Sequence, residues 1–60
     1  MKRIELFISD EQAWELAQLC KRIGYSDIRA LATDDDEADI MMSSVLMLQQ
    51  SLLEFGYSPR

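Results

Sequence analysis

The hydrophobic pattern begins with a short alternating segment, from Lys2 to Ile8. Within it, Ile4, Leu6 and Ile8 fall on one side, whereas Arg3, Glu5 and Phe7 fall on the other. A period of two with β-branched residues predicts a β-strand. A lone strand leaves its backbone groups unpaired, so we expect it to pair with a second copy, with another protein or with another part of the chain. A second copy is favoured because two-fold dimers are the commonest oligomers. The residues of this predicted dimer strand are Ile4, Leu6, Phe7 and Ile8.

A helix is predicted to follow at once, between Ser9 and Gly24. Ser9 and Gln12 have the spacing of a capping box, and glycine commonly ends helices. Lys21 and Arg22 fall in the last turn, where the helix dipole favours cations. At the helical period of about 3.6 residues, one apolar arc is expected to face the core. It contains Ala13, Leu16, Ala17, Leu19, Cys20 and Ile23.

The rest of the chain is predicted to be helical, in two segments. Residues 25–32 indicate a short helical turn capped by Ser26, and a long helix is expected from about Asp34 to Phe55, ending before Gly56. Apolar residues three and four apart form a packing seam on that helix: Ala38, Met41, Val45, Leu48, Leu52 and Phe55. We therefore expect a mainly α fold with one N-terminal β-strand (β-α-α), in a single domain of residues 1–60.

The composition argues against an enzyme. The chain has 60 residues and no histidine, and its two glycines are isolated, so imidazole catalysis and a phosphate-binding loop are excluded. Cys20 is the only cysteine, which excludes an internal disulfide and a structural zinc site. We expect no cofactor and no metal. A lone thiol fits a cytoplasmic protein, and no apolar run has the roughly 18 residues of a membrane span.

Charge is distributed unevenly along the chain. The net charge is −5, and residues 30–60 hold all of it, which argues against nucleic acid as a partner. Five carboxylates surround the expected start of the last helix: Asp34, Asp35, Asp36, Glu37 and Asp39. Their spacing lacks the glycine and glutamate of a calcium loop. Two interpretations remain open: a solvated helix start, stabilised by the dipole, or a patch that contacts a basic surface of a host protein.

Three apolar residues lie outside the predicted packing faces. Ile40 and Met47 are seven apart on the last helix, nearly opposite its seam, among serines. They are either scattered surface residues or a second contact face for a partner or a dimer. Trp14 lies outside the arc of its own helix, and tryptophan is enriched at binding hot spots. It either completes an interface or folds over the edge of the core.

The opening segment KRIELFISDEQAWELAQLCKRIGYS resembles the ribbon-helix-helix family of repressors and antitoxins. The resemblance implies a ribbon of paired strands in the DNA major groove, with Arg3, Glu5 and Phe7 facing the bases and Ser26 capping the second helix. Arg3 suits that role, whereas glutamate and phenylalanine are not typical of major-groove reading.

The whole chain resembles a family of short uncharacterised proteins from proteobacterial prophages and mobile elements. The segments KRIGYSDIRALATDDDEA and EFGYSPR carry this resemblance. By analogy of size and charge, it implies an anti-CRISPR-like inhibitor that covers a basic, nucleic-acid-binding surface of a host complex. The alternatives are a ribbon-helix-helix DNA binder and a structural module that assembles with itself.

Overall fold

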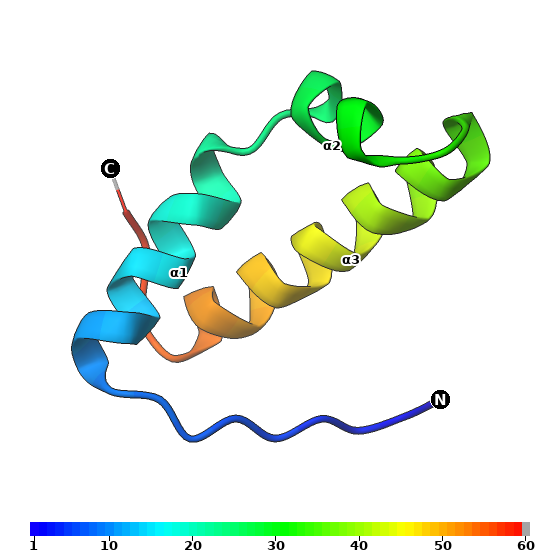
Figure 1. The fold of residues 1–60 in the computed structure, drawn as a ribbon. Helices are drawn as coiled ribbons and strands as arrows, with labels where there is room; N and C mark the ends of the chain where they lie inside the picture. The colour runs from blue at the N-terminus through cyan, green and yellow to red at the C-terminus, as the bar shows by residue number, and fades with distance from the viewer. Residues whose placement is uncertain (60) are drawn as a thin grey trace.

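Within residues 1–59, three helices form the body of the protein, and Figure 1 shows their arrangement. The structure, a computed structural model, describes residues 1–59. The helices are α1 (Asp10–Arg22), α2 (Tyr25–Leu31) and α3 (Asp35–Glu54). α3 packs against both α1 and α2, whereas α1 and α2 do not contact each other. The described residues contain no β-strand. The predicted β-α-α, ribbon-helix-helix-like fold is therefore wrong, and the chain is all-helical apart from its extended segments.

Residues 1–8, called the arm from here on, are extended and stand away from the helices along most of their length (Figure 1). The alternation of faces is retained, because Arg3 and Glu5 form an ion pair on one side. No backbone hydrogen bond joins the arm to the rest of the described chain. A strand requires such a ladder, and the helices offer no sheet edge to complete one. The strand predicted at Ile4, Leu6, Phe7 and Ile8 is therefore not formed.

Ser9 caps α1 as predicted. Its hydroxyl accepts a hydrogen bond from the backbone N–H of Gln12 at 3.0 Å, and the Gln12 side chain accepts one from the Ser9 N–H at 2.9 Å. These reciprocal bonds close the capping box. Ile8 and Ala13 occupy the flanking positions at which an apolar pair commonly fixes the path of the chain into a helix. The capping box thus sets the direction in which the arm leaves α1.

The other helix starts use acidic side chains. α2 has Gly24, rather than the predicted Ser26, as its N-cap, because the Asp27 carboxylate accepts a hydrogen bond from the Gly24 N–H at 2.8 Å. α3 is capped by Asp34, whose carboxylate accepts from the Glu37 N–H at 2.8 Å. Both bonds satisfy backbone donors that a helix start otherwise leaves to water.

The core lies between α1 and α3 and is built mainly from small side chains. Ala13, Ala17 and Cys20 of α1 are buried against Leu52 of α3. Small side chains let two helices approach closely, but each buries little apolar area. Half-buried residues complete this cluster: Leu16, Val45, Leu48 and Tyr57. On the other two helices, Ile28 and Ala38 are also buried.

Two residues expected on the packing faces are exposed instead. Leu19 of α1 lies outside the buried cluster, because only α3 packs against α1 and the covered face is narrow. Phe55 is 83% exposed. It is the C-cap of α3, with φ −88° and ψ 1°, so the chain leaves helical geometry there and the side chain no longer follows the seam.

The end of the chain folds back along α1. Gly56 has a φ of +94°, a left-handed conformation that glycine adopts without penalty, and it follows the helix as predicted. The N–H of Tyr57 then donates to the carbonyl of Leu52 at 3.0 Å. Further on, the Lys21 ammonium donates to the carbonyl of Pro59 at 3.2 Å. The tail therefore ties the end of α3 to α1.

The molecule is flat and more open than a compact chain of its length. Its extents are 34 × 29 × 15 Å, and its radius of gyration is 12.3 Å. A compact chain of this length has a radius of gyration of about 10.4 Å. The arm accounts for the openness that Figure 1 shows, since it projects from the helical body.

Candidate functional site

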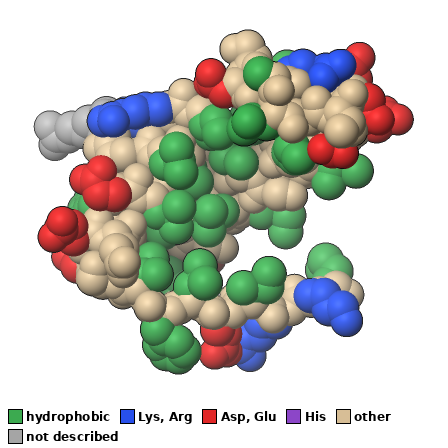
Figure 2. All heavy atoms as spheres, in the orientation of Figure 1, with side chains coloured by type: hydrophobic (Ala, Val, Ile, Leu, Met, Phe, Trp, Pro, Cys, Tyr) green, Lys and Arg blue, Asp and Glu red, His purple; other side chains and the backbone are tan. Residues whose placement is uncertain are grey.

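The five carboxylates singled out in the sequence gather at the start of α3, beside α2 (Figure 2). We call them the acidic corner. Asp35 pairs with Arg29 of α2 at 2.7 Å, yet its side chain remains 80% exposed. Asp34 caps the helix, and Glu37 accepts a hydrogen bond from Thr33 at 2.8 Å. Three of the five therefore have structural roles that do not remove their charge from the surface.

The other two carboxylates of the corner are Asp36 and Asp39, and both are exposed. Asp39 lies near Tyr25, whose pKa is raised by desolvation and then by Asp39 and Asp35. Asp36 has no hydrogen bond or ion-pair partner among the side chains of residues 1–59. It can consequently be changed without breaking a contact of the described chain.

The acidic corner does not have the geometry of a metal site. Within residues 1–59, no three carboxylate or thiol side chains converge closely enough to hold an ion. The reason is local: successive residues of a helix start point in different directions around its axis, and capping turns Asp34 toward the backbone. The corner can act on charged surfaces through its summed negative potential.

Ile40 and Met47 are both 67% exposed, so the structure leaves the second apolar stripe of α3 uncovered. Ile40 lies near the acidic corner in sequence, and its carbonyl accepts hydrogen bonds from the hydroxyls of Ser43 and Ser44. Met47 lies farther along α3 and lines a groove described below. The structure thus assigns the two residues to different surfaces, although they share one side of the helix.

Trp14 packs on the tail of its own chain. Its ring meets that of Tyr57 edge-on, with centroids 5.2 Å apart and planes at 82°, a favourable aromatic geometry. The Tyr57 hydroxyl also donates to the carboxylate of Asp10, and this bond raises the Tyr57 pKa, with smaller effects of desolvation and of the carboxylate charge. Trp14 is still 40% exposed, but its intramolecular contact gives it a structural role at the α1–tail junction.

The sequence alone did not reveal an apolar groove between the arm and the helices (Figure 2). Its volume is about 760 Å³, and it is open to solvent, because several of the residues that line it are exposed. The signal was present in the alternation of the arm, but only the fold shows that its apolar side opens toward α1 and α3. The arm contributes Lys2, Ile4, Leu6, Phe7 and Ile8. The helices and tail contribute Ala13, Leu16, Met47, Leu48, Ser51, Leu52, Phe55 and Tyr57.

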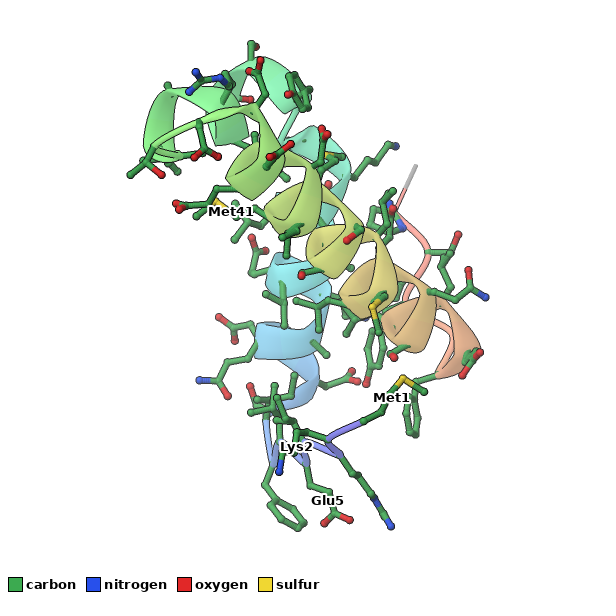
Figure 3. The ribbon with its side chains drawn as sticks, turned by 90° about the vertical axis from the view of Figure 1, so that its right-hand side faces the viewer. Met1, Lys2, Glu5 and Met41 are labelled. Atoms are coloured by element: carbon green, nitrogen blue, oxygen red, sulfur yellow. The ribbon has the colours of Figure 1, made fainter. Side chains whose placement is uncertain are left out.

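The acidic corner and the groove lie at opposite ends of α3. Figure 3 shows Met41, in the first half of α3, on the side of α2, whereas Met1, Lys2 and Glu5 lie at the other end of the molecule. The groove-lining residues of α3 all come from its second half, beginning at Met47. A partner on one surface therefore leaves the other free.

Cys20 is buried, and burial raises the pKa of its thiol. A buried thiol with a raised pKa holds little of the thiolate that nucleophilic chemistry requires. In the part of the chain that the structure describes, no helix is both long and apolar enough to cross a membrane.

Comparison with known proteins adds one finding. The model of a family of unknown function, DUF7706, matches residues 1–60. The chain belongs to the DUF7706 family. No curated protein and no solved structure matches it. Family membership therefore covers the whole length of the chain, including the arm, the acidic corner and the tail.

Proposed function

We propose that the protein is a small accessory factor of a phage or mobile element that binds and inhibits a host protein complex, without catalysing a reaction. It covers a basic, nucleic-acid-binding surface of that complex, as anti-CRISPR inhibitors do. The acidic corner carries the proposal: five carboxylates follow one another closely at the start of α3, beside Arg29 of α2, and four of the five are exposed. The inhibitory role and the mobile-element origin rest on size, charge and the family resemblance.

The physical mechanism is steric and electrostatic. A concentrated negative potential speeds encounter with a basic surface and selects it over neutral ones. Exposed ion pairs add little affinity by themselves, about 0.2–1 kcal/mol each. Apolar contact must supply the rest, and Ile40 and Leu31, both exposed and next to the corner in sequence, are available for it.

Reversing one charge tests this proposal. Asp36→Lys changes the corner without removing a cap or an ion pair, and Glu15→Lys makes the same charge change on exposed α1. Each variant and the wild type are used as bait in a host lysate, and the captured proteins are quantified. We expect at least one partner to be lost with Asp36→Lys and retained with Glu15→Lys. Because an attractive pair is replaced by a repulsive one of similar size, the affinity measured with purified protein should fall about 2- to 30-fold, and the difference should weaken with salt.

A set of captured proteins that is the same for both variants contradicts the proposal. Far-UV circular dichroism controls for folding, because lysine in a first turn opposes the helix dipole. The ribbon-helix-helix DNA binder is not proposed, since the ribbon on which that hypothesis depended is not formed.

A further inference from the structure

We infer that a second copy of this chain occupies the apolar groove, with the arm of each copy packed against α1 and α3 of the other. The contact is reciprocal, as a two-fold interface requires. It buries the apolar side of the arm and the groove at the same time. This inference stands apart from the proposed function, because the acidic corner lies at the other end of α3 (Figure 3).

The exposed area supports a second copy as the occupant. The described chain has an accessible surface of 5104 Å², whereas a compact monomer of 6.9 kDa exposes about 4,000 Å². The excess of roughly 1,100 Å² is comparable to the approximately 800 Å² that each partner contributes to a standard interface. Much of the arm and groove surface is apolar and exposed: Ile4, Leu6, Phe7, Met47 and Phe55.

The charges of arm and body are complementary. The arm carries Lys2 and Arg3 against Glu5, a net of one positive charge, while the body from residue 9 onward carries a net of six negative charges. The sum is the −5 of the whole chain. Five of the negative charges of the body belong to the acidic corner, away from the groove, which leaves the rest of the body with a net of one negative charge. An arm from a second copy therefore brings one positive charge to a body that is weakly negative outside the corner.

The geometry of the arm explains why it does not fill the groove of its own chain. The capping box at Ser9 fixes the direction of the arm, and the arm stands away from α3 with its apolar side facing the groove (Figures 1 and 2). Ile8, next to the cap, is the least exposed of its large apolar residues, whereas Ile4 and Leu6 on the same side are 81% and 62% exposed. A reciprocal dimer covers them without changing the cap.

Sedimentation equilibrium of the whole chain tests the inference. We expect a mass of about twice 6.9 kDa at micromolar to submillimolar concentration. Leu6→Asp places a charge on the apolar side of the arm, outside the helices and the buried cluster. Each dimer loses two leucine contacts, so its dissociation constant should rise roughly a hundredfold or more. Leu31→Asp, at an exposed position on α2 outside the groove, is the matched control and should remain dimeric.

A second measurement locates the interface. In a mixture of isotope-labelled and unlabelled chains, filtered nuclear Overhauser effects should connect the Leu6 methyls of one copy with those of Leu48 or Leu52 of the other. A monomer throughout the concentration range overturns the inference. So does a dimer that survives Leu6→Asp, or a dimer that lacks these intermolecular contacts.

Discussion

Replacing Leu52 with alanine removes the largest of the buried side chains in the cluster that joins α1 to α3. Leu52 is 7% exposed and packs with Ala13, Ala17 and Cys20. Burying a leucine side chain contributes about 1.5–3 kcal/mol, and its truncation in a core costs about 2–5 kcal/mol, because a cavity remains. The alanine neighbours are too small to fill that cavity. However, the site opens into the groove, so water can enter the cavity. We therefore expect Leu52→Ala to lower the free energy of unfolding by about 2–3 kcal/mol.

That loss is large for this chain. At about 0.05–0.15 kcal/mol per residue, 60 residues have a total stability of roughly 3–9 kcal/mol. Urea unfolding followed by far-UV circular dichroism measures the change, with Leu6→Asp as the background so that self-association does not contribute. Leu53→Ala is the control, since Leu53 is exposed and its truncation should cost less than about 1 kcal/mol. Equal losses of stability for Leu52→Ala and Leu53→Ala would refute the assignment of Leu52 to the face of α3 that packs against α1.

Three further changes probe the caps and the tail. Gly56→Ala forces a side chain into a left-handed conformation with no neighbour within 4 Å, so backbone strain alone should cost about 1–2 kcal/mol. Gly24→Ala, at negative φ, has no such strain and should cost less, about 0.5 kcal/mol, because alanine is a poorer N-cap than glycine. A thermal melt with equal losses at both glycines contradicts the C′ assignment. Ser9→Ala removes the hydroxyl that accepts a hydrogen bond from the Gln12 N–H, and it should lower the free energy of unfolding by about 1 kcal/mol. Ser9→Asp should retain most of the stability, because aspartate is also a good N-cap. Equal melting temperatures for Ser9→Ala and Ser9→Asp would count against the cap. The Tyr57 pKa is raised above its ordinary value of 10.0, so its contribution to stability is complete below about pH 10 and is lost as pH rises through the folded pKa. Tyr57→Phe should reduce the alkaline loss of stability, and an unchanged pH dependence would contradict the bond to Asp10.

The helices could be predicted because their signals are local. Ser9 and Gln12 form the predicted capping box, and Gly56 has the left-handed conformation expected after a helix. The predicted packing seam of α3 is confirmed at Ala38 and Leu52, which are buried. These features depend on residues three or four apart, so the sequence alone contains the information that they require.

The arm could not be predicted in the same way. Alternation along Lys2–Ile8 specifies an extended chain with two faces, but strand formation depends on a partner edge that the helical body does not provide. The groove could not be predicted either, because it exists only where the arm, α1 and α3 come together in the folded chain. The cap of α2 was mispredicted because Ser26 and Asp27 both suit a helix start, and only the fold shows Asp27 bound to the Gly24 N–H.

Self-association and partner binding are proposed at two independent ends of α3, and one paired experiment tests this separation most directly. Leu6→Asp, Asp36→Lys and the double variant are compared with the wild type for molecular mass and for affinity per chain toward the captured partner. We predict that Leu6→Asp changes only the mass, that Asp36→Lys changes only the affinity, and that the double variant shows both effects additively. Loss of dimerisation with Asp36→Lys, or loss of affinity per chain with Leu6→Asp, would contradict the independence of the two surfaces.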